Sequence, residues 1–264
     1  MIMKIGFIGA GNMGSALIKA IHQKKLAKTI IAFDPNEEGI KRLEEFKIKK
    51  AKNNQDVVRL SDIIFLAVKP FLIQPVIEEI YPIANSQQLF ISIAAGINLT
   101  TLENGLPGKK VIRVMPNTPC FVGEMAAGFT LGRECTKEDG ILVKKILDAG
   151  GVSFPVSEEK LDAVTGLSGS GPAFVAELIQ GFIEAGKSVG LDEETSRQLT
   201  LQTFLGTAKM LQEGFSEEQL KEMVTTKGGT TEAGRKVLEN SDVRTIIAKT
   251  IAAATERSKE MGKR

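Results

Sequence analysis

The hydrophobic positions in the first half of the chain follow two alternating patterns. Short, almost continuously apolar runs such as residues 63–68 are typical of strands buried on both faces of a parallel sheet. Residues 37–46 instead place Ile40, Leu43 and Phe46 three apart among charged side chains, which predicts an amphipathic helix. Because strands and helices alternate, we predict an α/β fold with a doubly wound, mostly parallel sheet, whose ligands bind beyond the carboxyl ends of its strands.

The pattern changes near residue 157, where strand signals end and long helical periods begin. Asp192 suits the cap of one helix, and Ser216 with Gln219 suits a capping box for another. We therefore predict two domains, 1–157 and 158–264, of which the second is all-helical. A helical array this small with a wide apolar face is expected to complete its burial against a second subunit.

Three spaced glycines follow the first apolar run. Gly9 suits a tight turn, Gly11 would let the backbone approach a pyrophosphate, and Gly14 would let the next helix pack closely on the strand. Unpaired amides at the start of that helix favour an anion. Asp34 ends the second strand at the spacing expected of the acid that binds an adenosine ribose. The combination predicts a dinucleotide site rather than an incidental glycine turn.

Other strand ends supply further candidates for lining this site, because the ligands of such sheets bind there. These candidates are Asn54, Lys69, Ala94, Ala95 and Asn117. Lys69 has a plain alternative, since a lysine before a proline turn also suits a solvated surface.

Residues 225–234 are rich in glycine and threonine and lie between two predicted helices. Gly228 and Gly229, followed by Thr230 and Thr231 at a helix start, predict a nest of backbone amides that suits a carboxylate or phosphate. The same residue types also suit an ordinary capped turn.

Composition narrows the class of partner. The chain has 264 residues with 34 basic and 32 acidic side chains interspersed, so that neither nucleic acid nor a membrane surface is an expected partner. No apolar stretch approaches the ~20 residues that span a bilayer. Cys120 and Cys135 have neither disulfide-framework nor metal-ligand spacing. We expect a cytoplasmic protein that binds a small molecule and no metal.

Five segments together resemble pyrroline-5-carboxylate reductase, namely residues 7–14, 66–70, 115–119, 161–174 and 227–231. The resemblance covers essentially the whole chain, and the last two segments are specific to that family. It implies a Rossmann-type N-terminal domain and a helical C-terminal dimerisation domain that interlocks two subunits, with homodimers assembled further into a ring, a decamer. It also implies the last step of proline biosynthesis, the NADPH- or NADH-dependent reduction of 1-pyrroline-5-carboxylate to L-proline.

The resemblance assigns roles to individual residues. Asn54 is expected to contact the nicotinamide-side ribose, and the Thr231 hydroxyl is expected near the ring nitrogen of the substrate as the candidate catalytic group. The segment from Gly228 to Thr231, comprising Gly228, Gly229, Thr230 and Thr231, is expected to hold the substrate carboxylate. The expected cofactor-binding residues are Ile8, Gly9, Ala10, Gly11, Asn12, Met13, Gly14, Asp34, Asn54, Ala67, Val68, Lys69, Pro70, Ala94 and Ala95.

Asp34 departs from the family pattern, because relatives that use NADPH tend to carry smaller or phosphate-tolerant residues there. A carboxylate that faces the ribose accepts hydrogen bonds from the hydroxyls of NADH and repels the 2′-phosphate of NADPH. Lys41 and Arg42 on the following helix are candidates for reaching that phosphate, although their spacing suits a solvated helix face at least as well. We expect NADH to be accepted.

The residue types favour an imine over an alcohol as substrate. Removing a proton from an alcohol requires a poised base, whereas an imine arrives protonated or nearly so. The single histidine, His22, ends the first predicted helix, and the single tyrosine, Tyr81, precedes Pro82 at a predicted helix end. Neither is well placed as a base.

Two alternatives stay open. A β-hydroxyacid dehydrogenase resembles this chain in its first motif, but Val175 and Leu178 stand where that family carries a catalytic lysine and an asparagine. A non-catalytic NAD-sensing module would use the second domain only for dimerisation or partner contact, and would not need the amide nest beside Thr231.

Overall fold

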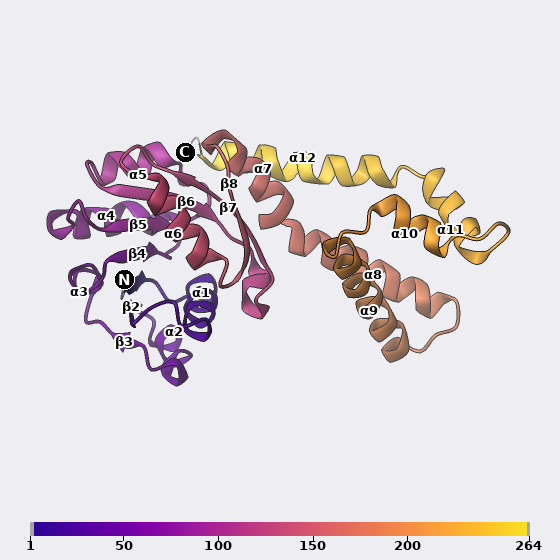
Figure 1. Ribbon diagram of the computed structural model, residues 1–264, viewed down its shortest axis with the longest axis horizontal. Helices are drawn as coiled ribbons and strands as arrows, with labels where there is room; N and C mark the ends of the chain where they lie inside the picture. Colours follow the sequence, from indigo (N-terminus) through magenta and orange to yellow (C-terminus); the bar gives the residue numbers. More distant parts are fainter. Residues whose placement is uncertain (1–2, 263–264) are drawn as a thin grey trace. The chain divides into compact units, whose positions relative to one another are not determined.

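The structure, a computed structural model, describes residues 3–262 and contains an eight-stranded sheet (Figure 1). Its order is β3-β2-β1-β4-β5-β6-β7-β8. Strands β1 to β6 pair in parallel, β7 is antiparallel to β6, and β8 is parallel to β7. The strands are β1 (Lys4–Ile8), β2 (Thr29–Phe33), β3 (Lys49–Lys50), β4 (Ile63–Leu66), β5 (Leu89–Ser92), β6 (Lys110–Met115), β7 (Met125–Leu131) and β8 (Gly151–Pro155).

Helices cover both faces of this sheet, which confirms the predicted doubly wound fold. Alternate residues of a strand point to opposite faces. In β4, Phe65 belongs to a core cluster with residues of α1 and α6, whereas Ile64 belongs to a second cluster with residues of α3, α4 and α5. The helices are α1 (Asn12–Gln23), α2 (Glu37–Lys41), α3 (Asn54–Leu60), α4 (Ile73–Ile80), α5 (Leu99–Gly105) and α6 (Lys137–Leu147).

The helix predicted over residues 37–46 is shorter than expected. Helix α2 ends at Lys41, and a 3₁₀ turn follows at Glu44–Phe46. Ile40 and Leu43 are nevertheless buried in the first core cluster. Residues three apart stack in a 3₁₀ turn, so this apolar spacing is satisfied without a continuous α-helix.

The described residues form two compact units. Unit 1 comprises residues up to Pro172 together with those from Ile251 onward, and unit 2 comprises Ala173–Thr250. The sequence boundary predicted at residue 157 therefore falls inside unit 1. The reason is packing: α7 (Leu161–Val164) lies on β7, where a Cβ on Gly128 would come within 2.9 Å of Val164.

The segment after β8 is tied to the sheet by polar contacts as well. The buried Arg113 of β6 donates a hydrogen bond of 2.6 Å to Glu158, and the same carboxylate oxygen accepts the Leu99 amide at 2.9 Å. Residues Thr165–Gly169 then form a π-helical turn that leads into α8 (Gly171–Ser188).

The last turns of α12 (Val243–Gly262) also pack on unit 1. The Ser258 hydroxyl donates to Asp162 at 2.6 Å. The Asn98 side chain donates to the Gly262 carbonyl at 3.4 Å. A helix near the end of the chain therefore contributes to the N-terminal unit, which the order of residues alone does not indicate.

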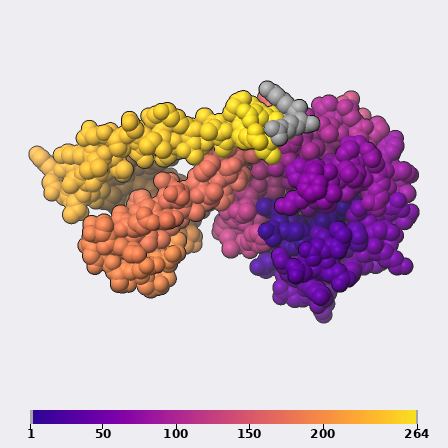
Figure 2. Space-filling model, turned by 180° about the vertical axis from the view of Figure 1, so that it is seen from behind, coloured from indigo at the N-terminus to yellow at the C-terminus, as the bar shows by residue number. Residues whose placement is uncertain are grey.

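Unit 2 is helical, as predicted, and its helices are orange to gold in Figure 2. The buried Ser196 donates to the Ile183 carbonyl at 2.7 Å and so joins α9 to α8. The predicted caps at Asp192 and at Ser216 with Gln219 are present. Besides parts of α8 and α12, unit 2 contains α9 (Glu193–Gln212), α10 (Glu217–Val224) and α11 (Thr230–Glu239).

Unit 2 exposes many large apolar side chains. In α8, Ile183 is buried, whereas Phe182 is 57% and Val175 47% exposed. Val237 of α11 and Ile246 of α12 are 70% and 61% exposed. Exposed apolar surface on this scale marks an interaction site. Within residues 3–262, no helix has the length and apolar character needed to cross a membrane.

Candidate functional site

A cleft of about 590 Å³ lies beyond the carboxyl ends of β1, β2, β4 and β5 in unit 1. The order of the strands reverses between β1 and β4, which is where open α/β sheets bind their ligands. The cleft is lined by Gly9, Gly11, Asn12, Met13, Asp34, Pro35, Ala67, Val68, Lys69, Pro70, Leu72, Ile93, Ala94, Ala95, Thr118 and Phe121.

Each glycine of the loop between β1 and α1 has a different environment. Gly9 has a φ of +98°, and a Cβ there would lie 2.6 Å from the Ala67 carbonyl oxygen. A Cβ on Gly14 would lie 2.7 Å from the Gly9 carbonyl oxygen. A Cβ on Gly11 would meet no described atom within 4 Å, and therefore only this glycine borders open space. Gly11 also precedes α1 without a side-chain cap, which leaves the first amides of that helix for a ligand.

Asp34 makes a contact that its position in the sequence does not reveal. One carboxylate oxygen accepts the Ala10 amide at 2.6 Å, and the other accepts the Asn36 amide at 2.8 Å. Asp34 therefore braces the glycine loop as well as lining the cleft. Each oxygen keeps a second acceptor position, so that contact with a ribose hydroxyl is still compatible with this geometry.

Helix α2 packs directly on the glycine loop. A Cβ on Gly39 would lie 2.7 Å from the Ala10 carbonyl oxygen. This close approach places the Arg42 guanidinium 3.5 Å from the side-chain oxygen of Asn12, a residue that lines the cleft. Arg42 therefore lies beside the loop, although its side chain is 60% exposed.

Four of the expected cofactor residues do not line the cleft. Ile8 and Ala10 are fully buried behind it, and Gly14 is buried in α1 against Gly9 and Ala67. Asn54 is the first residue of α3, and its side-chain amide donates to Glu79 of α4 at 2.7 Å. Its predicted contact with a ribose stays a prediction.

After β6, the sequence predicted that Asn117 would line the cleft, but other residues of this segment do so. Asn117 is 7% exposed, its amide donates to the Ser168 carbonyl at 3.0 Å, and its oxygen accepts the Ala126 amide at 2.8 Å. Thr118 and Phe121 line the cleft instead. The motif at residues 115–119 contains Thr118 and is a sequence signal that could have led to it, whereas Phe121 lies outside that motif.

The glycine–threonine segment belongs to unit 2 and has its own geometry. Gly228 has a φ of +74°, and the Gly229 amide donates to the Thr226 carbonyl at 2.9 Å. Helix α11 begins at Thr230, with Gly229 in the cap position and no side-chain cap. The Gly228 amide donates to a Glu232 carboxylate oxygen at 2.6 Å. That hydrogen bond and the ion pair with Lys236 hold the pKa of Glu232 below its ordinary value.

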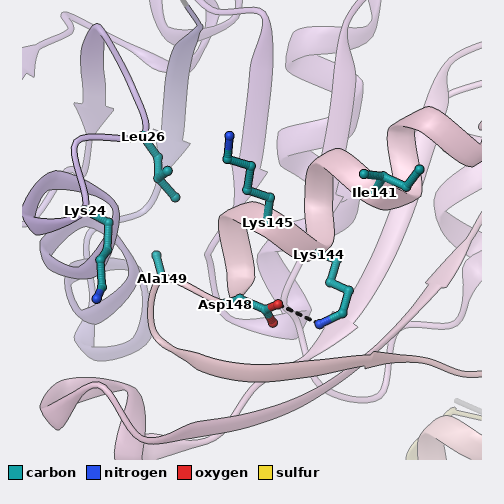
Figure 3. Close-up of a pocket in the computed structure, with 7 residues that line it drawn as sticks. All are labelled: Lys24, Leu26, Ile141, Lys144, Lys145, Asp148 and Ala149. Atoms are coloured by element: carbon teal, nitrogen blue, oxygen red, sulfur yellow. Dashed lines mark hydrogen bonds and ion pairs between the residues drawn. The ribbon is translucent and has the colours of Figure 1, made fainter.

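A second depression on unit 1, of about 550 Å³, lies at the other end of α1 (Figure 3). Lys24, Lys144 and Lys145 line it, and Figure 3 shows Lys144 directed at Asp148, with Nζ and Oδ2 2.6 Å apart. This depression shares no lining residue with the cleft at the glycine loop, and the ligands of such sheets bind beyond the carboxyl ends of the strands.

Both cysteines are poor nucleophiles. Burial raises the pKa of the Cys120 and Cys135 thiols to about 11, and the thiolate is the reactive form. In the part of the chain that the structure describes, no three His, Cys, Asp or Glu side chains gather as they would to hold a metal ion.

Comparisons with known proteins match both parts of the chain. Residues 158–261 match the family described as pyrroline-5-carboxylate reductase dimerisation, and residues 4–96 match the family described as NADP oxidoreductase, coenzyme F420-dependent. The pyrroline-5-carboxylate reductase of Methanosarcina acetivorans is 41% identical, over 99% of this chain and 98% of that protein.

Solved structures agree with these matches. A pyrroline-5-carboxylate reductase from Coxiella burnetii has a TM-score of 0.95 at 33% identity and covers 100% of both chains. The pyrroline carboxylate reductase of Plasmodium falciparum, solved with NADP bound, has a TM-score of 0.86 at 33% identity over 98% of each chain.

Proposed function

This chain belongs to the pyrroline-5-carboxylate reductase family, and we propose that it reduces 1-pyrroline-5-carboxylate to L-proline with NADPH or NADH, the last step of proline biosynthesis. The observation that carries the proposal is the cleft at the point where the strand order reverses. Its open side at Gly11 and the uncapped start of α1 fit a dinucleotide pyrophosphate.

The residues of the cleft fit such a cofactor along its length. The glycine loop and the first amides of α1 would hold the pyrophosphate, and Asp34, which braces that loop, would lie at the adenosine ribose. Residues Ala67–Pro70 and Ala94–Ala95 would line the remainder of the site. When bound, the reduced nicotinamide supplies a hydride.

The side chains and amides of the protein orient the substrate in this reaction. Hydride addition to the carbon of a protonated C=N bond gives a neutral secondary amine, which takes up a proton from water to become an ammonium. Because the reaction consumes protons and removes none from the substrate, no strong base is needed. The amides of the Gly228–Thr231 segment would hold the substrate carboxylate, and the Thr231 hydroxyl would hydrogen-bond the ring nitrogen. Catalysis then rests on orienting the ring and excluding water.

One assay tests this function against its two rivals. Purified protein is mixed with NADPH or NADH and pyrroline-5-carboxylate, and the loss of nicotinamide absorbance is followed. Oxidation that depends on the imine supports the reductase, whereas cofactor binding without turnover supports a sensing module. A second reaction with NAD+ or NADP+ and a β-hydroxyacid tests the dehydrogenase, which would produce a gain of nicotinamide absorbance. Val175 and Leu178 lack the polar groups which that chemistry requires.

Replacing Thr231 with alanine is expected to lower kcat/KM for the imine by about tenfold or more, because one oriented hydrogen bond to the substrate is lost. Cofactor affinity should barely change. Thr231→Ser keeps the hydroxyl and should retain most of the activity, and Thr101→Ala on the surface of α5 serves as an unrelated threonine control. Full activity in Thr231→Ala would show that Thr231 contributes only to the start of α11 and not to catalysis.

The exposed apolar side chains of unit 2 support a homodimer, because residues 158–261 match the dimerisation domain of the family. We expect light scattering after size exclusion to give at least a dimer, and the same measurement reads whether dimers assemble into a decamer. The predicted cytoplasmic location stays a prediction.

Ile246→Glu is expected to break this assembly into monomers and to lower the melting temperature, because a charge would be placed in the buried interface. Ile141→Glu is the matched control: Ile141 is 71% exposed on α6, in the other unit, against 61% for Ile246. An unchanged mass for Ile246→Glu would remove this face of α12 from the interface.

A further inference from the structure

The Gly228–Thr231 segment carries an anion of its own. The Gly228 amide donates to a Glu232 carboxylate oxygen at 2.6 Å, and the second oxygen lies 3.3 Å from the Lys236 ammonium. Glu232 is in the first turn of α11, next to the residues proposed to hold the substrate. Lys236 is 65% exposed, and solvent therefore screens its attraction to Glu232. The negative charge of Glu232 is only partly neutralised.

The remaining amides of the segment differ in their availability. The Gly229 amide is used by the Thr226 carbonyl. The amides of Thr230 and Thr231 are in the first turn of α11, which has no side-chain cap, and amides in that turn lack a partner within the helix. A substrate carboxylate that binds there would lie close to the Glu232 carboxylate.

We propose that Glu232 sets the affinity of this segment for carboxylates by occupying the Gly228 amide as an internal competitor. The proposal rests on the proposed function, because it concerns the same substrate site. To use the Gly228 amide, the substrate must displace Glu232. If it binds only the neighbouring amides, it meets a like charge. Either route weakens binding of the imine and of its product, L-proline, and speeds release of the product.

The charge and the hydrogen bond can be separated by substitution. Glu232→Gln keeps an oxygen that can accept the Gly228 amide but removes the negative charge. Glu232→Ala removes both and leaves the amide free. Glu239→Gln is the matched control, since Glu239 pairs with Arg235 at 3.0 Å on the same helix by the same four-residue spacing.

The experiment measures KM for pyrroline-5-carboxylate and the inhibition constant of L-proline in the full-length protein with its cofactor. Both constants are expected to fall by about fivefold in Glu232→Gln, the effect of removing one nearby like charge in water. Glu232→Ala should show a fall of the same size or larger. KM for 1-pyrroline, the imine without a carboxylate, should not change, and Glu239→Gln should behave as wild type.

A purely structural role predicts a different result. If Glu232 only caps α11, its substitution lowers the melting temperature and leaves the L-proline inhibition constant unchanged or higher. That outcome, in a wild-type protein that turns over the imine, overturns this inference and leaves the proposed function intact. A wild-type protein that does not reduce the imine with either cofactor removes the proposed function, and this inference with it.

Discussion

Replacing Gly11 with valine is expected to weaken the binding of NADPH and NADH by about a hundredfold or more, with little change in stability. The side chain would enter the cleft where backbone amides meet the pyrophosphate, and hydrogen bonds to a charged group contribute about 1.5–3 kcal/mol each. The fold should survive, because a Cβ at Gly11 meets no described atom within 4 Å and the backbone has an ordinary φ of −66°.

Gly14 is expected to respond differently to the same substitution. A Cβ on Gly14 would lie 2.7 Å from the Gly9 carbonyl oxygen, so that Gly14→Val should lower the melting temperature as well as the affinity. Gly11→Ala should give an intermediate loss of affinity at wild-type stability. Cofactor titration by nicotinamide fluorescence and a thermal melt measure the two effects. If Gly11→Val binds NADPH as tightly as wild type, the pyrophosphate does not pass over this loop.

Asp34→Ser is expected to raise the ratio of kcat/KM with NADPH to that with NADH by about fivefold to several hundredfold. A carboxylate ~4 Å from a 2′-phosphate costs about 1–4 kcal/mol, depending on screening. The absolute values should fall with both cofactors, because the Ala10 amide loses its acceptor at 2.6 Å and the glycine loop is less firmly held. Both cofactors share the pyrophosphate that this loop would contact, so the ratio isolates the effect of the charge.

Asp34→Asn is the matched variant, since it keeps the size of the side chain and one oxygen acceptor while it removes the charge. Steady-state kinetics with both cofactors measure the ratio for each variant. If the wild type strongly prefers NADPH and neither variant moves the ratio, Asp34 acts only as a brace of the loop. Selection between the cofactors would then lie elsewhere, with Arg42 beside Asn12 as the first residue to test.

Local patterns predicted most of the fold. The apolar runs identified the main strands, because a strand buried on both faces has few polar positions. Caps at Asp192 and Ser216 were predictable, because a cap depends on residues within one turn of each other. The close contact of Gly14 with the Gly9 carbonyl likewise joins residues that are near each other in the chain, whereas the contact of Gly9 with Ala67 is made only by the folded sheet.

The sequence by itself therefore determined the strand–helix alternation, the glycine loop at its first turn and the helical second half. Only the tertiary structure decided which side chains face the cleft and which serve the scaffold. Asp34 reaches the Ala10 amide, Asn117 turns to Ser168, and the end of α12 packs on unit 1 at Asp162. These contacts join residues 24 to 96 positions apart. A buried polar group takes whichever partner the packed chain brings within about 3 Å, and that choice leaves no periodic signal in the sequence.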